Sequence, residues 1–348
     1  MCGKTTTYHQ IKTYLCSIIS RNPIKRDRDM RYSVIIPVYN RPDEVDELLQ
    51  SLTRQSFKDF EVILVDDASQ DGTRAVMENY LQNHRSMDAR IVCHDINQGV
   101  SKSRNDGLAM AKGTFVSFLD SDDVLDCDFC KTLLEAAAKE EDVDIVCGNV
   151  DLHTPDGRRR KQFRTERLRR PVSVCPENDI RFYDVLHFLD ISCAKLFRRS
   201  LLESHNILFD KELRFAEDTL FSCTAAIFAR RIVVLPDYCG YTYLLQDTSC
   251  SVSMEIPMRL DSLKRFLMEL DRILPSAMRR MLLRKSLEYV WTIKKFGGIR
   301  RQEFLERTMN DRDLLALLDS SIRQFGGFKH RIVWSLIRHG ISSSLVFW

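Results

Sequence analysis

Short apolar runs alternate with longer segments in which apolar residues recur every three or four positions. The apolar runs cover residues 33–38, 60–65, 91–93, 114–119 and 144–148. Their length and bulky side chains predict buried strands. The segments between them predict helices near residues 42–52, 73–82, 100–111 and 126–139. Pro42 suits the first turn of its helix, and Val45, Leu48, Leu49 and Leu52 give that helix one apolar face.

This alternation of strand and helix repeats about four times, which predicts an α/β fold. We expect a Rossmann-like, mainly parallel sheet flanked by helices with right-handed crossovers. Open sheets of this kind bind ligands in the crevice outside the carboxyl ends of their strands. Residues at the ends of the predicted strands are therefore the first candidates for a site.

Two of the predicted strands end in carboxylates. Asp66 and Asp67 follow the second strand, and Asp120, Asp122 and Asp123 follow the fourth. Carboxylates this close repel one another, and oxygen ligands suit hard cations such as Mg²⁺ or Mn²⁺. The alternative is structural, with Asp122 or Asp123 capping the helix near residues 126–139.

The turn after the first strand lacks the glycines that cradle phosphates in dinucleotide-binding and P-loop proteins. It reads Pro37-Val38-Tyr39-Asn40-Arg41-Pro42. A nucleotide at this edge would need another source of positive charge. A cation on Asp120 and Asp122 would supply it.

Several stretches together resemble family 2 glycosyltransferases of the GT-A fold, over roughly residues 32–250. Six blocks occur in the family's order: Ser33–Asn40, Val65–Thr73, Gly99–Asn105, Leu119–Asp123, Ala194–Arg198 and Ala216–Phe221. The resemblance implies an inverting transferase that moves a sugar from a nucleotide-diphosphate sugar, with a UDP-sugar favoured. It also implies a Mn²⁺ or Mg²⁺ cofactor.

The resemblance assigns roles residue by residue. The nucleotide sugar would be bound by Pro37, Tyr39, Asp67, Arg104 and Asp120. The metal would be held by Asp120 and Asp122 of the family's DxD motif. From the residues alone, the favoured alternatives are that Asp67 is a helix or turn cap and that Arg104 is part of a solvated helix face. The segment 240–246 departs from the family pattern because it contains no arginine.

The pair Glu217-Asp218 precedes an apolar segment that predicts a buried helix. By resemblance, Asp218 is the general base that takes the proton of the acceptor hydroxyl. The alternative is that Glu217 or Asp218 serves only as the N-cap of that helix.

We expect a hexosyl- or N-acetylhexosaminyltransferase that acts on a glycan or a lipid-pyrophosphate-linked acceptor in surface polysaccharide or capsule assembly. One alternative enzyme is a sugar-1-phosphate nucleotidyltransferase, which should begin with a glycine-rich loop. A second alternative is a non-catalytic module that binds a nucleotide sugar or a lipid. Metal-dependent hydrolysis of UDP-sugars would separate an enzyme from such a module.

Length and charge suggest three parts. We expect an N-terminal extension at 1–31, a GT-A domain at 32–251 and a helical basic region at 252–348. The GT-A domain would divide into a nucleotide-binding half, 32–125, and an acceptor half, 126–251. Residues 252–348 carry 18 basic against 10 acidic side chains. Eight basic residues cluster within 158–170, as a solvated loop or as a patch for anionic lipid or a lipid-pyrophosphate acceptor.

Composition indicates the compartment. Eleven scattered cysteines in 348 residues indicate reduced thiols rather than a disulfide framework. We therefore expect a cytoplasmic protein, with peripheral binding to an anionic membrane as a further expectation. Nucleic acid is not an expected partner because no binding motif for it accompanies the basic cluster. The last stretch, with Ile332, Val333, Leu336 and Ile337 on one face, could lie in a membrane interface or pack on the domain.

Overall fold

The computed structural model describes residues 32–154, 159–162, 168, 170–244, 256–275, 278, 281–283, 285–286, 306–325 and 334. The chain divides into two units, residues 1–30 and 31–348, and all described residues belong to the second. The extension at 1–31, the predicted boundary at 251 and most of the basic cluster at 158–170 lie outside the described residues.

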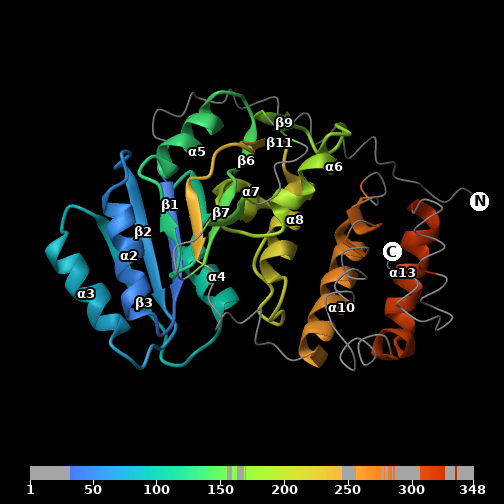
Figure 1. Ribbon diagram of the computed structural model, residues 1–348, viewed down its shortest axis with the longest axis horizontal. Helices are drawn as coiled ribbons and strands as arrows, with labels where there is room; N and C mark the ends of the chain where they lie inside the picture. Colours follow the sequence, from blue (N-terminus) through green and yellow to red (C-terminus); the bar gives the residue numbers. More distant parts are fainter. Residues whose placement is uncertain are drawn as a thin grey trace, which may run out of the picture. The chain divides into compact units, whose positions relative to one another are not determined.

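The main element is an eight-stranded mixed sheet with the order β3-β2-β1-β4-β10-β6-β11-β9 (Figure 1). Its strands are β1 (Tyr32–Val38), β2 (Phe60–Asp66), β3 (Asp88–Cys93), β4 (Phe115–Phe118), β6 (Val143–Cys147), β9 (Val172–Val174), β10 (Lys195–Arg198) and β11 (Arg231–Val234). The first four strands pair in parallel, as the alternating pattern predicts. Strand β10 runs antiparallel between β4 and β6, and β9 closes the edge antiparallel to β11.

A second, four-stranded sheet has the order β5-β12-β7-β8. It consists of β5 (Val124–Leu125), β7 (Val150–His153), β8 (Arg159–Gln162) and β12 (Tyr241–Leu244). Strands β5 and β12 pair antiparallel, so residues just after the DxD motif lie beside residues more than a hundred positions later. This sheet was not predicted from the sequence.

The described helices are α2 (Pro42–Thr53), α3 (Thr73–Asn83), α4 (Val100–Met110), α5 (Phe129–Ala138), α6 (Phe182–Val185), η1 (Leu186–Leu189), α7 (Arg199–Ser204), α8 (Glu217–Phe228), α10 (Ile256–Ile273) and α13 (Arg312–Phe325). Helix α2 begins with Pro42, and the predicted apolar face from Val45 to Leu52 is buried. Helix α5 begins at Phe129 with Asp128 as its N-cap residue. Asp122 and Asp123 therefore do not cap this helix, and the capping interpretation is wrong.

The chain reverses its direction of travel across the sheet at β1. Helices α2 and α3 follow strands that step outward from β1 and contact each other, whereas α4 leads back past β1 to β4 and packs on β1 and β2. Ligands of open α/β sheets bind at such a reversal, outside the carboxyl ends of the strands. In this chain, that position lies between the ends of β1 and β4.

Helices of the C-terminal region extend the same hydrophobic core. Helix α10 packs against α8 and α13, and Leu267, Leu270 and Leu318 belong to the core cluster that contains Phe118 and Phe221. Of the last stretch only Trp334 is described. It is buried, and its Nε1 donates to Asp319 Oδ1 at 2.6 Å.

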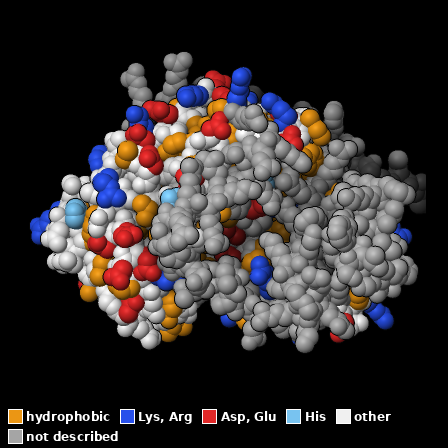
Figure 2. All heavy atoms as spheres, in the orientation of Figure 1, with side chains coloured by type: hydrophobic (Ala, Val, Ile, Leu, Met, Phe, Trp, Pro, Cys, Tyr) orange, Lys and Arg blue, Asp and Glu red, His pale blue; other side chains and the backbone are white. Residues whose placement is uncertain are grey.

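Acidic and basic side chains are interspersed over the upper and left parts of the face drawn in Figure 2. Among the described residues, no helix combines the length and apolar character needed to cross a bilayer. The eight cysteines that the structure describes are all free thiols, as the composition predicts.

Candidate active site

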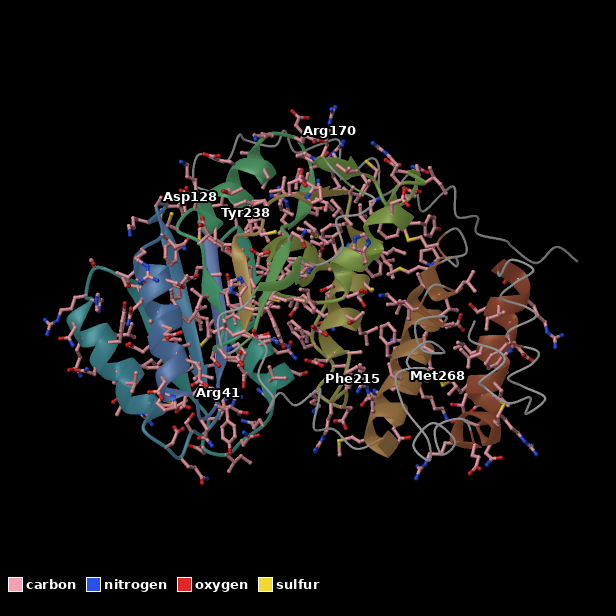
Figure 3. The ribbon with its side chains drawn as sticks, in the orientation of Figure 1. Arg41, Asp128, Arg170, Phe215, Tyr238 and Met268 are labelled. Carbon is pink, nitrogen blue, oxygen red and sulfur yellow. The ribbon has the colours of Figure 1, made fainter. Side chains whose placement is uncertain are left out.

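The candidate active site lies at the carboxyl edge of the sheet. The backbone ladder brings the strand ends together, since Asp67 N donates to Val38 O at 2.9 Å and Leu119 N donates to Ile35 O at 3.0 Å. In Figure 3, Arg41, just after β1, and Phe215, just before α8, lie toward the same lower edge of the molecule. Arg104 bonds both Asp120, just after β4, and Glu217, the first residue of α8, so the start of α8 reaches the edge where the DxD motif follows β4.

Arg104 of α4 is the centre of this site. Its guanidinium donates to Asp120 Oδ1 at 2.7 Å and to Glu217 Oε1 at 3.2 Å. The side chain is only 5% exposed and lies over the Phe209 ring, 5.0 Å from its centroid. The alternative of a solvated helix face is therefore wrong.

The environment keeps Arg104 positively charged. Burial alone would lower the pKa of Arg104, but the carboxylates of Asp120, Glu217 and Asp218 raise it above its ordinary value. The buried guanidinium of Arg104 thus forms salt bridges with carboxylates from both predicted halves of the domain, since Asp120 follows β4 and Glu217 begins α8. This arrangement fixes the DxD motif relative to the predicted catalytic base.

Packed aromatic rings support β4, the loop before α8 and α8 itself. Phe209 and Phe221 stack with centroids 3.9 Å apart, and Phe118 contacts both rings edge-on at 4.9 and 5.2 Å. Asn105, next to Arg104, exchanges two hydrogen bonds with the Phe209 backbone, each 2.9 Å long. The loop before α8 is thereby attached to α4, which carries Arg104.

Asp218 lies in the first turn of α8. The N-cap position belongs to Ala216, which holds a left-handed φ of 63°, so neither Glu217 nor Asp218 is the N-cap. Residues with a Cβ adopt this conformation at a cost, and such strain is concentrated at functional sites. Asp218 Oδ1 accepts a hydrogen bond from Thr219 N at 2.7 Å. Burial, with a further contribution from the Glu217 carboxylate, raises the pKa of Asp218 to about 7.

The three carboxylates of the DxD segment divide into two kinds. Asp123 is 1% exposed, and its two oxygens accept bonds from the Tyr241 hydroxyl at 2.5 Å and from Leu244 N at 3.2 Å. The same hydroxyl accepts the backbone N–H of Asp120 at 3.2 Å. Asp123 therefore attaches the DxD segment to β12, whereas Asp120 and Asp122 remain partly exposed.

These two carboxylates fit a hard divalent cation. Burial first, and then repulsion from Asp120, raises the pKa of Asp122. In the described part of the chain, the Asp122 carboxylate accepts a hydrogen bond only from its own backbone N–H. Two neighbouring carboxylates repel each other, and they have oxygen lone pairs that are not used in hydrogen bonds. A bound Mg²⁺ or Mn²⁺ would stabilise such a pair.

The remaining predicted nucleotide-binding residues form a second group around the ends of β1 and β2. Pro37 is buried within β1, and Tyr39, just beyond it, is 44% exposed and offers a ring face. Asp67 is 3% exposed and accepts the backbone N–H groups of Gln98 and Gly99, each at 2.8 Å. Asp67 thus anchors the loop that leads into α4, in agreement with the turn-cap alternative.

Two residues of the site were missed by sequence reasoning. Tyr241 lies in the segment 240–246, which departs from the family pattern by its missing arginine, and His94 lies in none of the six family blocks. His94 contacts Asp67 Oδ1 through Nδ1 at 2.7 Å and Asp106 Oδ2 through Nε2 at 2.9 Å. None of these three contacts has a local sequence signal, because the partners are 118, 27 and 12 positions away.

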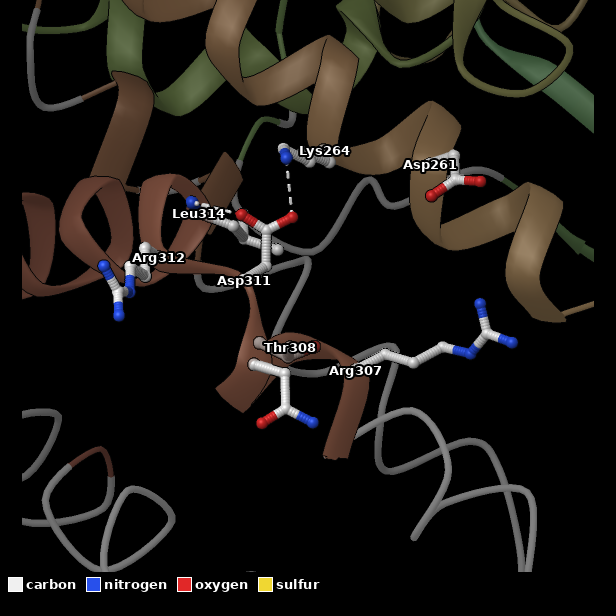
Figure 4. Close-up of a pocket in the computed structure, with 8 residues that line it drawn as sticks. Asp261, Lys264, Arg307, Thr308, Asp311, Arg312 and Leu314 are labelled. Atoms are coloured by element: carbon white, nitrogen blue, oxygen red, sulfur yellow. Dashed lines mark hydrogen bonds and ion pairs between the residues drawn. The ribbon is translucent and has the colours of Figure 1, made fainter.

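A separate cavity of about 450 Å³ lies between α10 and residues 307–314 (Figure 4). Its wall includes the ion pair of Lys264 Nζ with Asp311 Oδ2, 2.6 Å apart, and Asp311 Oδ1 also accepts Leu314 N at 3.1 Å. None of the predicted site residues lines this cavity. The candidate active site is therefore identified from its carboxylates and Arg104, and it does not coincide with this cavity.

A sheet of this topology, with one pair of carboxylates beyond β4 and another pair at the start of α8, is that of the GT-A fold. Residues 33–205 match the family model described as glycosyl transferase family 2. The chain belongs to this family, in which a divalent metal ion is typical.

Three proteins similar to this chain agree with the family assignment. An uncharacterized glycosyltransferase of Bacillus subtilis, EpsJ, is 34% identical over 209 residues, covering 59% of this chain and 58% of EpsJ. A Campylobacter jejuni protein, GalNAc(5)-diNAcBac-PP-undecaprenol beta-1,3-glucosyltransferase, is 32% identical over 191 residues, covering 55% and 58%. The crystal structure of Staphylococcus aureus TarS 1–349 in complex with UDP superposes with a TM-score of 0.69 at 25% identity, covering 90% of this chain and 88% of that one. The alignments with EpsJ and the Campylobacter protein thus span under two thirds of those proteins' length.

Proposed function

We propose that this chain is an inverting, metal-dependent glycosyltransferase that moves a hexosyl or N-acetylhexosaminyl group from a nucleotide-diphosphate sugar to an acceptor hydroxyl. The observation that carries the proposal is the link Asp120–Arg104–Glu217, which holds Asp218 close to the DxD carboxylates. Asp218 has a pKa raised to about 7, in the range expected of a general base at neutral pH.

The chemistry requires a carboxylate on the side of the sugar opposite the leaving nucleotide. The acceptor oxygen forms a bond to the anomeric carbon while the bond from that carbon to the diphosphate oxygen breaks. The acceptor proton passes to the Asp218 carboxylate, and the electron pair leaves with the nucleoside diphosphate. The geometry is that of an inverting glycosidase, with an alcohol in place of water.

Asp120 and Asp122 would hold the divalent cation, which supplies charge neutralisation for the leaving diphosphate. The exposed ring of Tyr39 would stack on the base, and Pro37 and Asp67 would complete the nucleotide pocket. Arg104 bonds carboxylates on both sides, so we assign it a positioning role in place of the predicted direct contact with the nucleotide.

The relatives support a class of donor and a class of acceptor. The UDP in the TarS structure supports a UDP-sugar donor. The name of the Campylobacter relative specifies a lipid-pyrophosphate-linked glycan, which supports an acceptor of that class or a related glycan polymer. We place the reaction on the cytoplasmic side of a membrane, in surface polysaccharide assembly. Co-sedimentation with anionic but not neutral vesicles would test the membrane contact.

The test of the proposed function is release of UDP from a panel of UDP-sugars, with Mn²⁺, with Mg²⁺ and with EDTA. A glycosyltransferase without its acceptor hydrolyses its donor slowly, and metal removal should stop this. A non-catalytic binding module would bind UDP in the same assay without releasing it from any sugar. That outcome would reject the proposed function.

A further inference from the structure

His94 lies between two carboxylates, and the proposed chemistry does not use it. Its side chain is 6% exposed, with Nδ1 facing Asp67 and Nε2 facing Asp106. Asp106 is also paired with Lys102, on the preceding turn of α4. Because an ionised carboxylate only accepts hydrogen bonds, the ring donates to both only when both nitrogens carry a proton.

This contact restricts what Asp67 can still bind. A carboxylate has about four acceptor positions. Within the described residues, Oδ1 of Asp67 accepts His94 Nδ1 and Gln98 N, whereas Oδ2 accepts Gly99 N. One acceptor position remains, and it is on Oδ2.

The segment from His94 to Gly99, beside Asp67, is fixed at both of its ends. His94 N donates to Asp66 O at 2.9 Å, so its backbone is attached to the end of β2. Gly99 adopts a φ of 89°, which turns its N–H onto Asp67 immediately before α4. Asp67 is therefore oriented from three directions, by an imidazole and by two backbone amides.

We propose that His94 is a positioning residue for recognition of the nucleotide base. It would hold Asp67 so that its remaining acceptor position meets a ring N–H donor such as N3–H of uracil. Cytosine carries no proton at N3 and presents an acceptor there, which the carboxylate would repel. This inference rests on the proposed function, because it assumes that the base lies at Asp67.

The chain offers a matched pair of substitutions. The amide nitrogen of asparagine superposes on histidine Nδ1, and that of glutamine superposes on Nε2. His94→Asn therefore keeps a donor for Asp67 and loses the one for Asp106. His94→Gln does the reverse.

The experiment measures the affinities of UDP and CDP by titration calorimetry, with Mn²⁺ present, for the full chain and both variants. We expect the wild-type chain to prefer UDP. His94→Gln should lower UDP affinity about tenfold, the cost of misplacing one charged hydrogen bond, with CDP affinity unchanged. His94→Asn should keep the UDP preference within about threefold of wild type, by the same relation between free energy and affinity.

Equal UDP-to-CDP ratios in wild type and His94→Gln, or equal losses in the two variants, would overturn the inference. Thermal unfolding verifies that each variant is folded. If His94→Gln is not, His94→Ser also removes the donor to Asp67 and should show the same loss. Asp67→Asn separates this inference from the proposed function. If Asp67→Asn changes the ratio and His94→Gln does not, only the role of His94 fails; if Asp67→Asn leaves the ratio unchanged, the placement of the base fails.

Discussion

The guanidinium of Arg104 donates to Glu217 Oε1 at 3.2 Å, although 113 positions separate the two residues. Its other terminal nitrogen bonds Asp120, so one side chain joins α4, the DxD motif and the first turn of α8. In the proposed reaction, these elements hold the metal and the base on opposite sides of the sugar. The stability of this bridge should therefore be measurable apart from catalysis.

Arg104→Met should lower the free energy of unfolding by about 3 kcal/mol at pH 8, because it leaves Asp120 and Glu217 without their buried cation. The loss should be smaller at pH 5. Burial raises the pKa of Asp218 and Arg104 lowers it, so without the cation this pKa rises further and the folded state binds the proton more tightly as pH falls. Denaturant unfolding at the two pH values measures this.

Arg181→Met is the control for that substitution. Arg181 is paired with Asp179 at 2.6 Å, but its side chain is 58% exposed. Exposed pairs are screened by solvent and contribute little to stability, so this variant should remain near wild type at both pH values. Equal effects of the two substitutions would contradict the central position of Arg104.

Tyr241→Phe should destabilise the fold by about 1–3 kcal/mol, because it leaves Asp123 Oδ2 and the Asp120 N–H without a partner. Tyr243→Phe is the matched control on the same face of β12, two residues along. The Tyr243 hydroxyl has no hydrogen-bond partner among the described residues, and its removal should cost less than about 0.5 kcal/mol. Thermal unfolding of the two variants compares them directly, and an equal loss would mean that the Tyr241 hydroxyl does not anchor the motif.

Asp122→Ala should abolish the effect of metal on UDP affinity. Binding of UDP to the wild-type chain should be much tighter with Mn²⁺ or Mg²⁺ than with EDTA, since the turn after β1 lacks the glycines that would hold the diphosphate. Titration calorimetry gives both affinities. Asp128→Ala is the control, because Asp126, Cys127 and Asp128 form another acidic group on the surface. A metal effect that survives Asp122→Ala but not Asp128→Ala would place the cation elsewhere.

The pH dependence of turnover should show an acidic limb. Burial and the neighbouring Glu217 raise the pKa of Asp218 to about 7, and only the ionised carboxylate can accept a proton. A cation at Asp120 and Asp122 would lower this pKa, so the limb is expected at or below about pH 7. Turnover under saturating donor and metal, measured from pH 5 to 9, should rise with pH and then level off. A rate independent of pH across this range would argue against a carboxylate base.

The same raised pKa has a consequence for stability. An Asp whose pKa is higher in the folded chain than in the unfolded chain binds its proton more tightly when folded, so the free energy of unfolding falls as pH rises from about 4 to 7. Replacing Asp218 by Asn removes this penalty. The variant should therefore be at least as stable as the wild-type chain at pH 8.

Much of the fold of residues 32–125 was predictable. Strands β1 and β2 are continuous apolar runs that end in turn residues or acids, and α2 begins with Pro42 and two acidic residues. These are local signals, and the structure agrees with them to within a few residues. The parallel pairing of β1 to β4, though not their order in the sheet, then followed from the alternation of strands and helices.

The rest of the site depends on contacts without a local signal. Strand β12 is four residues long, and its pairing with β5 places Tyr241 beside the DxD motif. Nothing near Tyr241 in the sequence indicates that its hydroxyl would reach Asp123. The residues of β10 were noted only as part of a block that resembles the family, and no strand was predicted there. Four residues that include the buried Lys195 do not form a clear strand pattern.

The central claim is that Asp218 is the general base, and the most direct test is the turnover of Asp218→Asn. This change keeps the size and removes the charge, and loss of a positioned base typically costs about 10²–10⁴-fold in rate. Glu217→Gln is the control and should be milder, because Glu217 contacts Arg104 and is not the proton acceptor. We predict that turnover of Asp218→Asn falls at least 100-fold, by the same range, while UDP–Mn²⁺ affinity and the melting temperature are retained. Turnover above about a tenth of wild type, given that range, would contradict the account.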